Sequence, residues 1–169
     1  IQYNKILRYM KLIGKSKFTN RFYDESKALM LSIWKPSTEA MTEIGYKQEM
    51  LLAVEHIRKH PTKYFLVYTQ NFRYIISPDL QLWTVKNIAE PIVQLGVERL
   101  AYVVPHEFIS SLSVEQTIEE TKYVRGNRAY QFSYFEEENE AIKWLLEEKA
   151  TSHYIETNLN TQEIRKWLR

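Results

Sequence analysis

Short apolar runs, separated by polar turns and by longer segments with helical spacing, outline the predicted fold of this chain. Runs rich in Val, Ile, Tyr and Phe are typical of strands, and near-continuous apolar character is typical of strands covered on both faces. Only Glu25-Ser26-Lys27 separates the first two runs, which predicts a hairpin. The predicted strands are Phe18–Asp24, Ala28–Trp34, Tyr64–Thr69, Arg99–Val104 and Tyr130–Phe135.

Segments between the later strands carry the start and stop signals of helices. Ser77-Pro78-Asp79 combines a capping serine, a proline suited to the first helical position and an acid suited to the helix dipole. Pro91 is expected to kink or restart this helix, and Gly96 to close it. The other predicted helices run from Ser37 or Thr38 to about Lys59, over His106–Leu112, over Ser113–Tyr123, over Glu136–Glu148 and from Asn160 onward.

Strands separated by helices require crossover connections, and these make parallel sheets. The order of elements therefore predicts an α/β fold with a single, mostly parallel (mixed) sheet of about five strands, an N-terminal hairpin and helices packed on the sheet.

The long helix that ends near Lys59 carries two apolar stripes on nearly opposite sides. One stripe is expected to cover the sheet and the other to need a second partner. For the second stripe we expect cover from residues 1–15 or 152–169, or from a second subunit of a homodimer. The two stripes are Met41, Ile44, Leu51 and Leu52 on one side, and Tyr46, Met50, Val54 and Ile57 on the other.

The charge is unevenly distributed. Six Lys or Arg and no acid lie between Ile1 and Phe22, whereas six Glu and one Lys lie between Glu136 and Glu148. These runs are typical of two solvated faces, or of a basic N-terminal arm that touches an acidic partner. We expect a basic amphipathic helical segment at 1–15 closed by Gly14, an α/β domain at 16–149, and a C-terminal tail with a short helix at 150–169.

Composition narrows the function classes. The 169 residues suit one domain with a full core. The absence of Cys excludes disulfides and thiolate metal sites and fits a reducing, cytoplasmic location. No apolar run approaches the roughly 20 residues of a membrane span. The net charge of +2 does not predict nucleic-acid binding, and no phosphate-binding glycine loop or other cofactor motif is present.

Several of these motifs, in this order and spacing, resemble one protein family. They are the two-strand start ending at Trp34, the Ser77-Pro78-Asp79 helix containing Pro91, and the stretches Leu100–Pro105, Leu112–Glu115 and Tyr134–Leu145. Together they cover roughly Met10 to Glu148 and look like the STAS-domain, SpoIIAA-like proteins of the small stand-alone bacterial type.

The resemblance implies a single sheet with helices, a cytoplasmic location, no catalysis, and binding of partner proteins or small ligands. In anti-sigma-factor antagonists of this family, a partner kinase phosphorylates a serine at the start of the helix after the third sheet strand, and Ser77 holds the matching position. The Asp and the Ser-Gly pair of those proteins are missing between Thr69 and Ile76, and the loop is longer. A related resemblance, to CRAL-TRIO lipid-transfer domains, implies apolar ligands.

The candidate surface is the carboxyl edge of the sheet, where open α/β sheets place their sites. Arg73 offers a bidentate fork and the start of the following helix offers backbone donors, so we expect an anionic ligand or an acidic segment of a partner protein to bind there. The candidate residues are Thr69, Asn71, Arg73, Ser77, Asp79 and His106.

Two other functions stay open. A carrier of an apolar small molecule would line its pocket with Trp34, Trp83, Tyr102 or Phe108, and a hydrolase would use Ser77 or His106. Among other sites, His56 and His60 have the i, i+4 spacing of zinc ligands but lack an evident third ligand, so no metal is expected. Single-stranded bases could stack on Tyr130, Phe132 and Tyr134, but we expect helices to cover that face.

Overall fold

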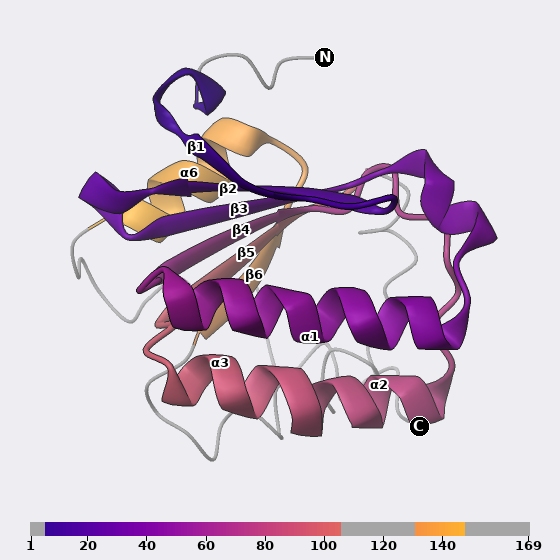
Figure 1. The fold of residues 1–169 in the computed structure, drawn as a ribbon. Coiled ribbons are helices and arrows are strands. Elements are labelled where there is room, and N and C mark those ends of the chain that lie inside the picture. The colour runs from indigo at the N-terminus through magenta and orange to yellow at the C-terminus, as the bar shows by residue number, and fades with distance from the viewer. Residues whose placement is uncertain (1–5, 106–130, 148–169) are drawn as a thin grey trace, which may run out of the picture.

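The protein is an α/β domain built on one six-stranded sheet (Figure 1). The computed structural model describes residues 6–105 and 131–147. The strands lie in the sheet in the same order as in the chain. They are β1 (Lys11–Lys15), β2 (Thr19–Asp24), β3 (Leu29–Trp34), β4 (Tyr64–Tyr68), β5 (Arg99–Val103) and β6 (Gln131–Phe135).

The sheet is mixed, as predicted. The first three strands form an antiparallel meander, and β3 to β6 are parallel. The helices are α1 (Glu43–Lys59), α2 (Pro78–Thr84), α3 (Glu90–Gln94) and α6 (Glu138–Leu146), and a π-helical turn, Val85–Ala89, joins α2 to α3. Predicted helices over His106–Leu112 and Ser113–Tyr123 and the one from Asn160 lie outside the described residues.

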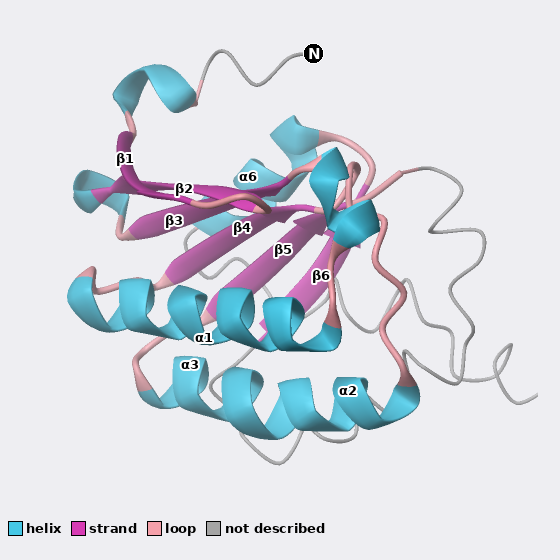
Figure 2. Cartoon of the chain, turned by 45° about the vertical axis from the view of Figure 1, so that its right-hand side comes forward, coloured by secondary structure: helices cyan, strands magenta, loops and turns pink. Residues whose placement is uncertain are grey.

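Helices cover both faces of the sheet (Figure 2). The α1 helix and the α2–α3 segment lie side by side on one face, and α6 lies on the other. Two apolar cores result. The larger contains Met30, Tyr46 and Leu100 and lies under α1, α2 and α3. The smaller contains Leu31, Leu66 and Leu145 and lies under α6.

The predicted helix over residues 1–15 is wrong for the part that is described. A 3₁₀ turn covers Leu7–Tyr9, and Lys11–Lys15 forms edge strand β1, paired with β2. The pairing register shifts between Leu12 and Gly14, so this strand contains a β-bulge. Gly14 therefore does not cap a helix, and the sheet begins before residue 16.

The long helix starts later than predicted. Residues Pro36–Ala40 form a 3₁₀ turn, and the Thr42 side chain caps α1 by accepting a hydrogen bond from the Gly45 N–H at 3.1 Å. The shift leaves Ser37 and Thr38 outside the helix, where Thr38 acquires another role.

The prediction of what covers the second stripe of α1 is also wrong. Tyr46, Val54 and Ile57 are buried in the larger core, so the described sheet and the α2–α3 segment cover this stripe. Ile44, Leu51 and Leu52, on the opposite side, are the exposed stripe instead.

The predictions for the following helix are confirmed. Ser77 caps α2, with its Oγ accepting a hydrogen bond from the Leu80 N–H at 3.3 Å, and Pro78 takes the first helical position. The helix changes to a π-helical turn just before Pro91, where the missing N–H of a proline interrupts an α-helical ladder. Gly96 ends the segment with φ of +101°, a conformation that favours glycine.

Candidate functional site

The parallel strands end together at one edge of the sheet, after Trp34, Tyr68, Val103 and Phe135. In open α/β sheets a binding crevice forms where the strand order reverses. Here the order does not reverse between β3 and β6, and both α1 and the α2–α3 segment lie on the same face (Figure 1). Within the described residues, the carboxyl edge therefore lacks the crevice that a reversal of strand order creates.

The loop that leaves β4 at this edge is held by one buried hydroxyl. Thr38 is fully buried, and its Oγ1 accepts a hydrogen bond from the Arg73 N–H at 2.8 Å. The same oxygen lies 2.9 Å from the Lys35 carbonyl and 3.3 Å from the Asn71 carbonyl, to which it can donate its proton. Thr38 thus joins the segment after β3 to the segment after β4.

Side chains of this loop alternate between the core and solvent. Phe72 packs edge-on to Trp34, with ring centroids 5.0 Å apart, and Tyr74 stacks on Tyr46 at 5.8 Å. Arg73 and Ile75, between and after these anchors, point outward, and Ile75 is 88% exposed. Two aromatic anchors therefore hold a cation and a large aliphatic side chain in a fixed position at the surface.

The Arg73 guanidinium contacts only neutral acceptors among the described residues. Its Nη1 donates to the carbonyl of Gln70 at 3.0 Å and lies 3.5 Å from that of Phe72. These bonds orient the side chain without neutralising its charge, so the remaining guanidinium donors stay available for a carboxylate or phosphate.

Further cations lie at the same edge, in the turn between β1 and β2 and just after β3. The Lys35 N–H donates to the Phe18 carbonyl at 2.9 Å, its Nζ donates to the Ser16 carbonyl at 2.6 Å, and the Ser37 Oγ donates to the Lys17 carbonyl at 2.7 Å. Together with Arg73 they make up a set of cations at the carboxyl edge of the sheet. We call it the basic strip, and it consists of Lys15, Lys17, Lys35 and Arg73.

None of these four cations forms an ion pair with a carboxylate of the described residues. Arg73 was predicted at this site but Lys35 was not, and Lys15 and Lys17 were expected in or next to the basic N-terminal segment. The hairpin predicted around Glu25-Ser26-Lys27 contained the signal, because its register brings Lys17 and Lys35 to the same end of the sheet.

The other predicted site residues are less well placed to bind a ligand. Thr69 turns back onto the sheet, with its Oγ1 donating to the Val103 carbonyl at 3.2 Å. Asn71 is half-buried, Ser77 and Asp79 are exposed at the start of α2, and His106 lies outside the described residues. Since the Ser77 Oγ caps its own helix, the described contacts give it no base that would activate it as a nucleophile.

No protein-family model, curated protein or solved structure matches this chain.

The residues expected to line an apolar pocket pack into the larger core. Trp34 is buried there, and Trp83 and Tyr102 pack against it. Trp83 also lies under the Lys47 Nζ, 5.4 Å from the ring centroid, and Tyr102 stacks on Tyr134 at 5.2 Å. Phe108 lies outside the described residues.

Two features are absent from residues 6–105 and 131–147, namely a set of metal ligands and a membrane-spanning helix. No three His, Cys, Asp or Glu side chains gather there as a metal-ligand set, so His56 and His60 find no third ligand within these ranges. None of the helices there combines the length and the apolar character needed to cross a membrane.

A buried polar cluster between β2 and α1 was not predicted from the sequence. The Arg21 Nη2 donates to the Glu49 carbonyl at 2.8 Å and lies 3.3 Å from Glu49 Oε2, which also accepts from the Thr19 hydroxyl at 2.8 Å. Burial lowers the pKa of the Arg21 guanidinium, and the charge of Glu49 opposes this effect. Because the Arg21–Glu49 pair is enclosed by the fold, we assign it a structural role.

His56 lies next to this cluster. Its Nδ1 is buried and finds no hydrogen-bond partner among the described residues, and its ring lies against Gly14 of β1. Burial lowers the pKa of His56, and the positive charges of Arg21, His60 and Lys59 lower it further. The neutral imidazole is therefore the form that the fold favours.

Proposed function

We propose that this chain is a non-enzymatic binding module that recognises an acidic segment of a partner protein through its basic strip. The observation that carries the proposal is the set of four cations at the carboxyl edge, none paired with a described carboxylate. The proposal keeps the STAS, SpoIIAA-like type suggested by the sequence motifs, supported by the order of strands and helices.

The neighbouring apolar side chain favours a protein partner. Ile75 is 88% exposed and adjoins Arg73 on a loop fixed by Phe72 and Tyr74. An aliphatic side chain beside a cation suits a segment that alternates acidic and apolar residues. Because the aromatic anchors and Thr38 already hold the loop, little conformational entropy is lost when a partner binds.

The test uses a fluorescent peptide of alternating Glu and Leu residues, with a Gln-for-Glu peptide as its control. Anisotropy should report binding of the acidic peptide alone, weakening as salt screens the charges. Arg73→Ala and Lys17→Ala should each weaken binding about tenfold or more, because each removes a charge-assisted contact. Lys86→Ala, which removes an exposed lysine from the helical layer, serves as the matched control.

Competition distinguishes the other ligands. Inorganic phosphate or a single-stranded oligonucleotide that displaces the acidic peptide at low concentration would assign the basic strip to that ligand and overturn the proposal. Equal binding by the wild type, Arg73→Ala and Lys17→Ala would show that the basic strip is not the recognition surface.

A further inference from the structure

The outward side of α1 carries an apolar stripe that no described residue covers. Ile44 is 70% exposed, Leu51 46% and Leu52 39%. Leu82, on neighbouring α2, adds another exposed side chain to the same helical layer. Exposed aliphatic side chains gathered in one helical layer indicate an interaction surface, whereas scattered single ones do not.

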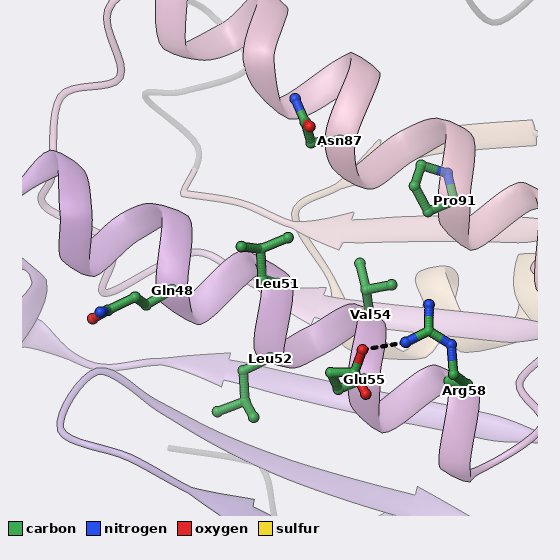
Figure 3. A pocket seen from close by; sticks show the side chains of 8 residues that line it. All are labelled: Gln48, Leu51, Leu52, Val54, Glu55, Arg58, Asn87 and Pro91. Atoms are coloured by element: carbon green, nitrogen blue, oxygen red, sulfur yellow. Dashed lines mark hydrogen bonds and ion pairs between the residues drawn. The ribbon is translucent and has the colours of Figure 1, made fainter.

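The stripe borders a groove of about 520 Å³ between α1 and the α2–α3 segment. Figure 3 shows Leu51 pointing toward the segment that carries Asn87 and Pro91, while Leu52 projects from the other side of the α1 ridge. A ridge with an adjoining groove is the shape into which a second helix packs.

The charges along α1 indicate which helix packs against this ridge. Residues four apart are neighbours on a helix surface, and the row centred on Leu51 is Lys47, Leu51 and Glu55. When this row is paired with an antiparallel copy of itself about Leu51, Lys47 faces Glu55 of the copy and Glu55 faces Lys47 of the copy. Both charges of the row then meet their opposites.

The ion pairs that these side chains form within one chain do not prevent the pairing between two copies. The Lys47 Nζ lies 2.6 Å from Glu43 Oε1, and Glu55 pairs with Arg58. The side chains of Lys47 and Glu55 are 34% and 50% exposed, and to reach a second helix Lys47 exchanges its contact with the Trp83 ring for one with Glu55 of the copy. In antiparallel packing the two helix dipoles also point in opposite directions, which is electrostatically favourable.

We propose that a second copy of this chain covers the stripe, with the two α1 helices antiparallel about a two-fold axis at Leu51. A two-fold interface uses the same patch on both subunits, which requires a patch that complements itself. The row on α1 has this property. The inference is independent of the basic strip, which lies at the carboxyl edge of the sheet.

Cross-linking tests the position of the axis. Because the chain has no cysteine, a single introduced thiol has a unique position. Leu51→Cys should cross-link to its own copy through a bismaleimide whose reach matches the roughly 8–10 Å between packed helix axes. Glu140→Cys, on α6 across the sheet, is the matched control and should not cross-link. Equal cross-linking of both variants overturns the proposed axis.

Charge reversal tests the pairing. Sedimentation should show a wild-type dimer. Lys47→Glu or Glu55→Lys alone should weaken it about tenfold or more, and the double reversal should restore it. Leu51→Glu, which places two carboxylates at the axis, should weaken it at least about 100-fold. Circular dichroism confirms that each variant is folded.

A wild-type chain that sediments as a monomer at every accessible concentration overturns the proposal and assigns the stripe to a different protein. A dimer that survives Leu51→Glu overturns it as well, because the subunits would then meet elsewhere.

Discussion

Arg21 shows how much one buried charge can depend on one partner. Its side chain is 2% exposed and that of Glu49 is 8% exposed, so neither charge has water as an alternative partner. Removing one member of such a pair leaves the other uncompensated in a medium of low dielectric constant. The pair therefore specifies how β2 faces α1, even where its net contribution to stability is small.

Replacing Glu49 should be strongly destabilising. For Glu49→Ala we expect a loss of about 3–5 kcal/mol in the free energy of unfolding, measured by urea denaturation, because the Arg21 charge stays buried. The matched control is Glu98→Ala, since Glu98 pairs with Lys63 at 3.7 Å on the surface and should cost less than about 1 kcal/mol.

The double replacement Arg21→Met/Glu49→Leu removes both charges and should recover most of the loss, because buried ion pairs often give way to apolar residues at little cost. A Glu49→Ala protein as stable as the wild type would show that Arg21 reaches solvent.

Among the elements, strands β2 to β6 were predictable from sequence and the N-terminal edge strand β1 was not. Apolar runs ended by Pro36 and Pro105 located β3 and β5 to within a residue or two, because an interior strand is apolar on both faces and a proline cannot continue it. In β1 only Leu12 and Ile13 are large and apolar, between two lysines, so the helical spacing of residues further upstream outweighed them.

The candidate site was predictable to the same extent. The end of β4 pointed to Arg73 through chain order alone. Lys17, Lys35 and Thr38 join that site only through contacts between segments that are 17 or more residues apart in the chain. The periodicity of a short stretch of sequence carries no information on such contacts, so they could be found only from the structure.

The contact between β1 and α1 depends on a missing side chain. A Cβ at Gly14 would lie 2.4 Å from His56 Cε1, well inside van der Waals contact. Gly14→Ala should therefore lower the free energy of unfolding by about 1–3 kcal/mol in urea denaturation, as overpacking typically does.

Two further variants test whether the His56 ring causes this loss of stability. In a His56→Ala background Gly14→Ala should cost much less, since the clashing ring is gone. Gly45→Ala, in α1, has no neighbour closer than 3.4 Å and should stabilise by about 0.5–1 kcal/mol. If Gly14→Ala costs the same in both backgrounds, the loss comes from the bulge conformation and not from His56.

At the scale of the whole molecule, the same histidine couples stability to pH. Burial and neighbouring positive charges lower the pKa of His56 below its ordinary value of 6.5 in the folded state. Above that value His56 is neutral in both states and contributes no pH dependence. As the pH falls through 6.5 the unfolded chain binds a proton that the folded chain does not, so stability decreases.

Urea denaturation between about pH 5 and pH 8, where ordinary carboxyl groups stay ionised, should show this decrease in the wild type. His56→Gln should reduce the slope by up to one proton equivalent, because the substituted side chain does not titrate. Identical slopes for the two proteins would contradict a lowered His56 pKa and place the acid sensitivity elsewhere.

The agreement between strand order and chain order also bears on how this protein is made. No described strand has to insert between two strands that are already paired, since each one joins the free edge left by the one before it. On the ribosome, the antiparallel meander of β1, β2 and β3 leaves the exit tunnel before β4, β5 and β6, and its contacts are local and close quickly. Each later strand then arrives with a finished template beside it. The sheet can therefore lengthen in one direction as translation proceeds.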